Sequence, residues 1–363
     1  MTWAQPLPSP FLQLLLDMNT ASSLFDLVIS GPISASLANS LSTFVPAAKM
    51  LCEENRLRLC GLEKHVCETI RRDVLSGIAT CDTAFVPAGL SLRDFRCAFF
   101  DMDSTLIGNE CIDELAALYD VKDQVAEITE RSMRGELDFE HSLRERVKLL
   151  AGAPSSIIDK AAALIRPTPG AKETLALFHS FGVKTYIASG GFTQFAEIVA
   201  RDYGMSGFVC NRLVIKDGKL TGETTGPAGG RVLDRAGKRR TMEVIAQVNG
   251  ASLFQCIAGG DGANDLEMIG AAGFGFAYHA KPIVAQAAPY KINVGTFAVA
   301  GDWFIESRTC TGEGRDPTEE SGSERYFSER VQNIRLSEKY RIGTQYFCRR
   351  LYLLRQPGTS GEL

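Results

Sequence analysis

The fold is decided by the stretch Cys97-Ala98-Phe99-Phe100-Asp101-Met102-Asp103-Ser104-Thr105, in which a short apolar run ends in two carboxylates. The apolar run has the length of a buried strand. Two later runs repeat the pattern: Lys184-Thr185-Tyr186-Ile187-Ala188 ends in Ser189-Gly190-Gly191, and Phe254-Gln255-Cys256-Ile257-Ala258 ends in Gly259-Gly260-Asp261-Gly262. We interpret the three runs as strands with polar or glycine-rich residues at their carboxyl ends.

Helical patterns lie between these strands, at residues 172–181, 193–203, 239–248 and 263–272. Strands that alternate with helices predict an α/β fold, with a Rossmann-like parallel sheet covered on both faces. Ligands of such sheets bind beyond the carboxyl ends of the strands. We therefore expect Asp101, Ser189 and Asp261 to meet at one edge of the sheet.

Four further helical patterns, at residues 112–119, 125–134, 139–150 and 155–165, separate Asp103 from Pro167. This stretch is too long for a plain crossover between two strands. We interpret it as a helical cap, at about residues 108–166, inserted after the first strand of a core domain that covers residues 93–300.

The two ends of the chain differ from this core. Residues 1–92 predict a small α+β region, with a loose arm around Pro6 to Pro10, a strand at 25–29 and helices at 33–44 and 62–75. Residues 301–363 are expected to be a poorly ordered extension, in which 309–323 resembles a linker. Basic residues spaced among aromatics follow at 325–355, where they form either a contact for an acidic partner or part of that extension.

Composition narrows the class of protein. The 363 residues carry a net charge of −4, so no basic field points to nucleic acid. No apolar run is long enough to cross a membrane, and no basic residue precedes the first short apolar run, so we expect no secretory signal. The ten cysteines form no CxxC pair and predict a reducing, cytoplasmic compartment. The group Cys60, His65 and Cys67 is either a metal site or a set of ordinary structural residues.

The acidic residues predict a cation. Asp101 and Asp103 at the end of a buried strand are costly unless something neutralises them. Asp261 and Asp265 add two carboxylates to the same edge. Each aspartate alone is compatible with a helix N-cap, but the four together favour a hard divalent cation. Mg²⁺ suits a phosphate substrate.

Two further segments suit a phosphoryl group. Ser189-Gly190-Gly191 is predicted to open a helix, whose free N–H groups favour an anion. Lys238 precedes another predicted helix and offsets phosphate charge. Taken singly, the serine is compatible with an ordinary N-cap and the lysine with a surface residue.

In this order the motifs form a known pattern, which we quote from this sequence: Asp101-Met-Asp-Ser-Thr-Leu-Ile, Glu110-Cys-Ile-Asp-Glu-Leu-Ala, Ser142-Leu-Arg-Glu-Arg-Val, Ser189-Gly-Gly-Phe-Thr, Gly260-Asp-Gly-Ala-Asn-Asp-Leu-Glu-Met and Gly275-Phe-Ala-Tyr-His-Ala-Lys-Pro. Over roughly residues 93–290 the chain resembles the phosphoserine phosphatase family of the haloacid dehalogenase (HAD) superfamily. Residues 1–92 resemble, more weakly, an ACT-like regulatory domain.

The resemblance implies hydrolysis of phosphoserine, the last step of serine biosynthesis, through an aspartyl phosphate. It makes Asp101 the nucleophile and Asp103 the general acid and base. Mg²⁺ is then held by the Asp101 carboxylate, the Asp103 backbone carbonyl and the Asp261 carboxylate, with Asp265 supporting its water shell. The phosphoryl oxygens are bound by Ser189, Gly190 and Lys238, with Asn264 nearby.

The resemblance also assigns cap residues to the amino acid part of the substrate. The resemblance assigns the substrate ammonium to Glu110 and its carboxylate to Arg146, whose planar guanidinium suits that group. Met133 and Phe139 are expected to line the apolar side of the pocket or to belong to the cap core.

Other functions stay open on the sequence alone: a phosphatase for another small phosphomonoester, a phosphotransferase, a non-catalytic protein with the same fold, and a nucleic-acid or membrane contact through the basic tail. The oligomeric state is also open, with a homodimer as one option.

Overall fold

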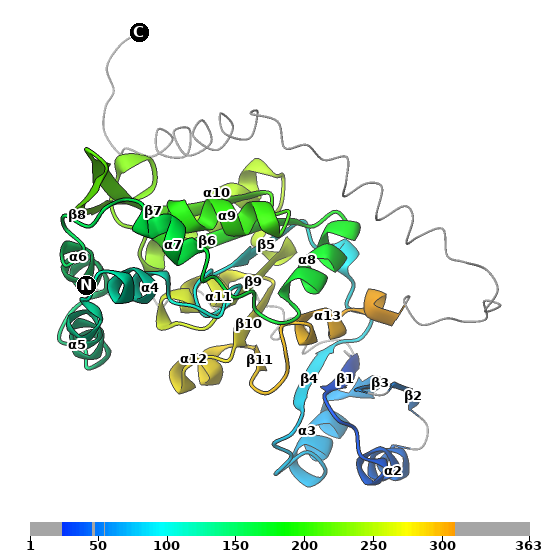
Figure 1. Cartoon of the computed structure of the whole chain (residues 1–363). Coiled ribbons are helices and arrows are strands. Elements are labelled where there is room, and N and C mark those ends of the chain that lie inside the picture. Colours follow the sequence, from blue (N-terminus) through cyan, green and yellow to red (C-terminus); the bar gives the residue numbers. More distant parts are fainter. Residues whose placement is uncertain (1–23, 46–47, 54, 309–363) are drawn as a thin grey trace, which may run out of the picture.

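The computed structural model describes residues 24–45, 48–53 and 55–308, which form a small N-terminal sheet domain, an α/β core and a helical cap (Figure 1). The core sheet has the strand order β11-β10-β9-β5-β6-β7-β8. The pairs from β11 to β7 are parallel, and β7 with β8 is antiparallel. The strands are β5 Cys97–Phe100, β6 Lys184–Phe192, β7 Gly207–Lys216, β8 Lys219–Thr225, β9 Cys256–Gly260, β10 Phe274–Tyr278 and β11 Tyr290–Ile292.

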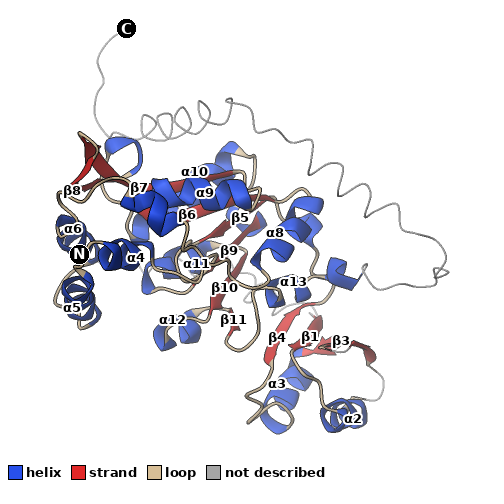
Figure 2. Cartoon of the chain, in the orientation of Figure 1, coloured by secondary structure: helices blue, strands red, loops and turns tan. Residues whose placement is uncertain are grey.

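The central strand β5 is buried on both faces because its side chains alternate between two apolar layers. Cys97 and Phe99 pack in the layer formed with α10 and α11. Ala98 and Phe100 pack in the layer formed with α8 and α9. Figure 2 shows these helices around the sheet. Their bounds are α8 Ala171–Ser180, α9 Thr193–Asp202, α10 Arg235–Val248 and α11 Leu266–Ala271, with α12 Pro282–Ala287 near β10. The parallel sheet predicted from the sequence is confirmed.

The cap consists of α4 Cys111–Leu118, α5 Lys122–Met133, α6 Phe139–Lys148 and α7 Ile157–Ala162. The chain enters and leaves it through two linkers that pair with each other. Gly108 N–H donates to Arg166 O at 2.8 Å, and Thr168 N–H donates to Leu106 O at 3.0 Å. The cap helix α6 also packs against β8. Figure 1 shows α4, α5 and α6 gathered on the side of the core away from the N-terminal sheet.

The N-terminal domain is an antiparallel sheet of order β2-β3-β1-β4. Its helices share an apolar cluster with one face of that sheet. The strand predicted at 25–29 lies within β1, whereas the helix predicted from Leu62 begins only at Lys64, because Leu62 still belongs to β3. The elements are β1 Leu24–Ser30, α2 Ala35–Phe44, β2 Lys49–Glu53, β3 Arg56–Glu63, α3 Lys64–Asp73 and β4 Asp82–Pro87.

The other face of this sheet packs on the segment that follows the core. Arg58 on β3 is buried, pairs with Asp26 at 2.9 Å and donates to the carbonyl of Trp303 at 3.2 Å. Trp303 lies between α13 (Val299–Asp302) and a short 3₁₀ turn (Ile305–Arg308), and its side chain is buried. Residues 301–304, which were predicted to belong to a poorly ordered extension, are thus part of the packed structure. The predicted N-terminal arm, the linker at 309–323 and the basic stretch at 325–355 lie outside the described residues.

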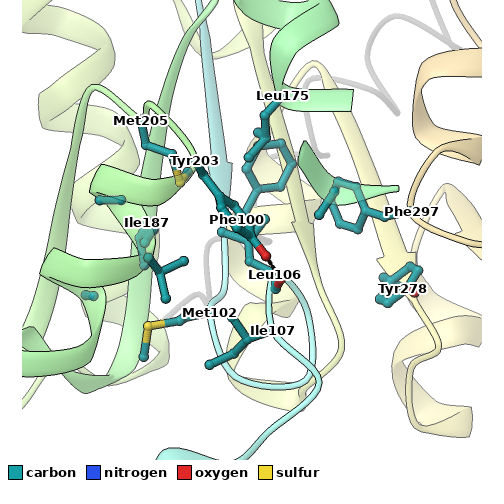
Figure 3. Close-up of a cluster of buried hydrophobic side chains, with 14 of the residues drawn as sticks. Phe100, Met102, Leu106, Ile107, Leu175, Ile187, Tyr203, Met205, Tyr278 and Phe297 are labelled. Carbon is teal, nitrogen blue, oxygen red and sulfur yellow. Dashed lines mark hydrogen bonds between the residues drawn. The ribbon is translucent and has the colours of Figure 1, made fainter. Parts of the chain in front are cut away.

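A buried cluster supports the loop that follows β5 (Figure 3). Phe100, Met102, Leu106 and Ile107 all contribute to it. The Tyr203 hydroxyl donates to Leu106 O at 2.8 Å, which ties this loop to the end of α9. Among the described residues, no helix has the length and apolar character needed to span a membrane.

Candidate active site

Three neighbouring strands bring the predicted site residues to one edge of the sheet. Asp101 directly follows β5, Asp261 directly follows β9, and Ser189 lies near the end of β6. Because β9, β5 and β6 are adjacent and parallel, their carboxyl ends meet. The convergence expected from the sequence is therefore present in the tertiary structure.

A buried lysine neutralises two of the carboxylates. The Lys238 ammonium lies 2.8 Å from Asp101 Oδ2 and 2.7 Å from Asp265 Oδ1. Burial lowers the pKa of Lys238, but these two carboxylates more than offset that effect, so its pKa lies above the usual value. The lysine belongs to the first turn of α10 and has no exposed surface, which rules out the alternative of a surface lysine.

The acidic residues here suit a metal ion. Asp101, Asp261 and Asp265 offer carboxylate oxygens that all lie within 4.8 Å of one another. Three carboxylates face one lysine charge, so when all three are ionised two negative charges remain for a cation to balance. Burial, with the charge of Asp101 adding to it, raises the pKa of Asp261 to about 7. A bound cation reverses that shift by favouring the ionised form. Carboxylate oxygens are typical ligands of hard divalent cations.

Asp103 is held by the cap. Its Oδ1 accepts the backbone N–H of Cys111, the first residue of α4, at 3.0 Å. Burial raises the pKa of Asp103 to about 6, the Cys111 contacts oppose the shift, and the charge of Asp101 adds to it. A carboxyl group with this pKa exchanges protons near neutral pH, as a general acid and base must.

The Ser189-Gly190-Gly191 segment differs from its prediction. It does not open a helix, because β6 continues to Phe192 and α9 begins at Thr193. The segment forms an irregularity at the strand end, where the pairing with β7 shifts between Ser189 and Phe192. Gly191 N–H donates to Ser189 Oγ at 3.0 Å. A Cβ on Gly191 would lie 2.5 Å from Asp103 Oδ2, so this backbone runs directly beside the carboxylates.

The cap reaches the same edge. Glu110 is exposed at the N-cap of α4 and accepts a hydrogen bond from Ser104 Oγ at 2.8 Å. Desolvation of the Glu110 carboxylate by the surrounding protein is the main cause that raises its pKa to about 7, and the negative charge of Asp103 adds to it. Burial lowers the pKa of Arg146 on α6, and the negative charges of Glu110, Asp113 and Asp103 oppose the shift. The two predicted cap residues are thus electrostatically coupled to each other and to Asp103.

The two apolar cap residues Phe139 and Met133 lie in different environments. Phe139 contacts the glycine segment, since a Cβ on Gly190 would lie 2.6 Å from its ring. Met133 is 65% exposed, so it does not belong to the cap core. The structure therefore brings Phe139 to the site, whereas Met133 points to solvent.

Asn264 and Thr105 also lie near the carboxylates at this edge of the core sheet. Asn264 lies in the short turn Ala263–Asp265, with its side chain folded towards Gly262. The hydroxyl of Thr105, which is fully buried, donates to Asp261 Oδ1 at 3.2 Å. Thr105 has no role predicted from the sequence, although its position two residues after Asp103 is a signal that could have indicated one.

Comparisons with known proteins identify the family of this chain. A family model described as haloacid dehalogenase-like hydrolase matches residues 98–270. The chain is 46% identical over 213 residues to a phosphoserine phosphatase of Streptomyces coelicolor, an alignment covering 59% of this chain and 51% of that protein. It is also 46% identical over 192 residues to a phosphoserine phosphatase of Streptococcus thermophilus, covering 53% of this chain and 87% of that protein. The chain thus spans about half the length of the first of these relatives and most of the second.

Solved structures show the same fold. A probable phosphoserine phosphatase from Vibrio cholerae, in unliganded form, is 31% identical, with a TM-score of 0.65 over 84% of this chain and 96% of that chain. A structure titled as a phospho-aspartyl intermediate analogue of phosphoserine phosphatase is 37% identical, with a TM-score of 0.54 over 58% of this chain and 99% of that chain.

Proposed function

We propose that this chain, which belongs to the phosphoserine phosphatase family of the haloacid dehalogenase-like hydrolases, hydrolyses O-phospho-L-serine to L-serine and phosphate. The observation that carries the proposal is the Lys238 ammonium between Asp101 and Asp265, beside the third carboxylate of Asp261. Phosphoryl transfer depends mainly on positioning and charge neutralisation, and this arrangement supplies both. The relatives' names support the choice of substrate.

In the proposed reaction, a carboxylate oxygen of Asp101 attacks phosphorus and the bond from phosphorus to the serine oxygen breaks. Asp103 gives its carboxyl proton to that leaving oxygen. A water molecule then attacks the aspartyl phosphate, its proton passes to Asp103, and the bond from phosphorus to Asp101 breaks. Phosphate leaves and both aspartates return to their starting states. The intermediate analogue solved for a related phosphatase supports this covalent route.

We propose Mg²⁺ as the metal, held by Asp101, Asp261 and the backbone carbonyl of Asp103, with Asp265 supporting its water shell. When bound, it neutralises charge on the transferring phosphoryl group. Ser189, Gly190 and Lys238, with Asn264 nearby, are proposed to bind the phosphoryl oxygens. The support is the meeting of these residues at one sheet edge.

Glu110 and Arg146 are proposed to select the amino acid part of the substrate. Glu110 binds the ammonium group and Arg146 the carboxylate, with Phe139 against the glycine segment as the apolar wall. Their mutual electrostatic coupling at the cap face supports this pairing. A charge-assisted hydrogen bond contributes about 1.5–3 kcal/mol, which is roughly 10- to 100-fold in kcat/KM.

The test is phosphate release by the purified chain from O-phospho-L-serine, with and without Mg²⁺. Phosphoethanolamine, which lacks the carboxylate, and 3-phosphoglycerate, which lacks the ammonium, serve as matched substrates, and p-nitrophenyl phosphate as a generic one. We expect phosphate release to depend on Mg²⁺, and kcat/KM for phosphoserine to be about 10- to 100-fold higher than for each analogue. Equal rates on phosphoserine and p-nitrophenyl phosphate would contradict the substrate assignment.

We also propose a cytoplasmic location and a homodimer. The support for the first is the cysteine content, ten residues without a CxxC pair, which is typical of a reducing compartment. The strand β2 is an edge of the N-terminal sheet, and an edge strand offers backbone groups for pairing with a second copy. Cell fractionation tests the first proposal, and light scattering of the purified chain tests the second.

A further inference from the structure

We propose that Asn211 on β7 is a positioning residue that orients both the Gly190–Gly191 peptide and the start of α10 for the phosphoryl group. The inference rests on the proposed function for the identity of the reaction. The residue has no exposed surface and lies at the end of the strand pairing between β6 and β7, opposite Phe192. Nothing in its sequence context marks it, since a single asparagine in a strand carries no motif.

The first hydrogen bond of Asn211 acts on the glycine segment. Its Nδ2 donates to the carbonyl oxygen of Gly190 at 2.8 Å. That carbonyl lies where the pairing of β6 with β7 shifts, between Ser189 and Phe192, so a side chain supplies the partner. In a trans peptide the C=O and the following N–H point in opposite directions. Holding the Gly190 carbonyl towards β7 therefore turns the Gly191 N–H towards Ser189 Oγ, which accepts it at 3.0 Å.

This peptide lies directly beside the proposed general acid Asp103 and the cap residue Phe139. A Cβ on Gly191 would lie 2.5 Å from Asp103 Oδ2, and one on Gly190 would lie 2.6 Å from the ring of Phe139. Because Asn211 holds the Gly190 carbonyl, that oxygen cannot turn towards the incoming anion, which it would repel. The Gly191 N–H meanwhile fixes the position of Ser189 Oγ, so that the serine keeps its own O–H to donate to the phosphoryl group.

The second hydrogen bond acts on the lysine helix. Asn211 Oδ1 accepts the Leu233 N–H at 2.7 Å. The next residue, Asp234, caps α10 by accepting Gly237 N–H at 2.8 Å, and its carbonyl accepts the Lys238 N–H at 2.9 Å. One buried amide thus fixes the backbone from which Lys238 reaches Asp101. A single side chain must both donate and accept here, which among uncharged residues of this shape only asparagine does.

The experiment compares wild type with Asn211→Asp and Asn211→Ala. The aspartate variant keeps the shape and the acceptor for Leu233 but loses the donor to Gly190, and the alanine variant loses both. Thr224→Val is the matched control, because Thr224 is a buried side chain on the adjacent strand β8 whose hydroxyl donates to Arg212 O at 3.0 Å, a carbonyl of β7. All assays run well below each variant's Tm, so that loss of folded protein does not contribute.

We expect kcat for phosphoserine to fall about tenfold or more in both Asn211 variants, with KM changed less than about threefold. Orthovanadate, which mimics the transferring phosphoryl group, should inhibit both variants more weakly by a similar factor, because the lost stabilisation belongs to the transition state. Thr224→Val should lower Tm but change neither constant more than about twofold. A purely structural role predicts a lower Tm with the two constants unchanged.

The inference is overturned if both Asn211 variants keep kcat within twofold of Thr224→Val, or if kcat falls while vanadate inhibition is unchanged. Hydrolysis of p-nitrophenyl phosphate separates this outcome from a failure of the proposed substrate. A wild type that cleaves the aryl phosphate but not phosphoserine contradicts the substrate and still allows the Asn211 comparison. A wild type whose Tm does not respond to orthovanadate with Mg²⁺ overturns the inference together with the phosphoryl site.

Discussion

The Lys238 ammonium lies 2.7 Å from Asp265 Oδ1, and neither side chain has any exposed surface. Removing one member of a buried ion pair leaves an uncompensated charge, and this costs about 3–5 kcal/mol. The pair therefore contributes to stability as well as to the charge balance of the site. The first prediction follows from it.

Replacing Lys238 with Met should lower the free energy of unfolding by about 3–5 kcal/mol and abolish phosphate release, because Asp101 and Asp265 lose their shared cation. Urea denaturation and a phosphate assay measure the two effects. The control is Lys184→Met, since that lysine is exposed on β6 and its ammonium donates to the uncharged Asn249 Oδ1 at 2.8 Å. A loss under about 1 kcal/mol for Lys238→Met would contradict the pairing argument.

Asp101→Asn should reduce turnover by about a thousandfold or more while leaving the fold intact, because the amide is isosteric but not nucleophilic. Phosphate release and thermal unfolding measure the two properties. Asp217→Asn makes the same chemical change at an exposed turn with φ 51°, a conformation that asparagine tolerates, and should be neutral. Residual activity near that of the control would rule out Asp101 as the nucleophile.

Arg146→Lys should lower kcat/KM for phosphoserine about 10- to 100-fold, because lysine cannot offer a planar pair of donors to the substrate carboxylate. Phosphoethanolamine lacks that carboxylate, so its kcat/KM should change little. Arg144→Lys on the same helix is the control, since that arginine is solvent-accessible and pairs with Glu140 at 2.8 Å. Equal losses on both substrates would point to a general defect of the cap instead.

Mg²⁺ should stabilise the protein more as pH rises. Burial raises the pKa of Asp103 to about 6 and that of Asp261 to about 7, above the unfolded value of about 3.9. A carboxyl with a raised folded pKa contributes stability below the unfolded pKa, and this contribution is lost as pH rises towards the folded pKa. Metal-free stability attributable to these groups should thus fall between about pH 4 and 7.

Because Mg²⁺ binds the ionised carboxylates, its effect should grow over the same range. Tm measured from pH 5 to 8 with and without Mg²⁺ tests this. Asp261→Asn removes one of the titrating groups and should flatten the difference. A Mg²⁺ effect that is independent of pH, or identical in the variant, would contradict the assignment of Asp261 as a ligand.

Arg58→Leu should destabilise the packing of the N-terminal sheet on α13 by about 3–5 kcal/mol, since the Asp26 charge would stay buried without the opposite charge of Arg58. The double change Asp26→Leu with Arg58→Leu removes both charges and should cost less than the single change. Urea denaturation measures the difference. A double variant that is less stable than the single one would show that the charges are not the main cause.

The order of strand and helix along the core was predictable, because apolar runs of strand length end in Asp101, Ser189 and Asp261 and are separated by helical periodicity. The strands β2, β3, β4, β7, β8, β10 and β11 were not identified. Strands such as β8 carry no continuous apolar run, so local pattern does not distinguish them from loops. The helical pattern at 193–203 matches α9, but the prediction that Ser189-Gly190-Gly191 opens this helix is wrong, because non-local strand pairing with β7 extends β6 to Phe192.

The residue types and their order were enough to predict a cation and phosphoryl site at the strand ends, and the family resemblance supplied the reaction, because both depend on local motifs. The burial of Lys238 between Asp101 and Asp265, and the hydrogen bond from Asn211 to the Gly190 carbonyl, could be seen only in the folded protein. Both results depend on strand order and helix packing, which bring together groups far apart in the chain. Residue types indicate which chemical groups are available. Burial and hydrogen-bond partners depend on how the strands and helices pack, so they cannot be read from a local stretch of sequence.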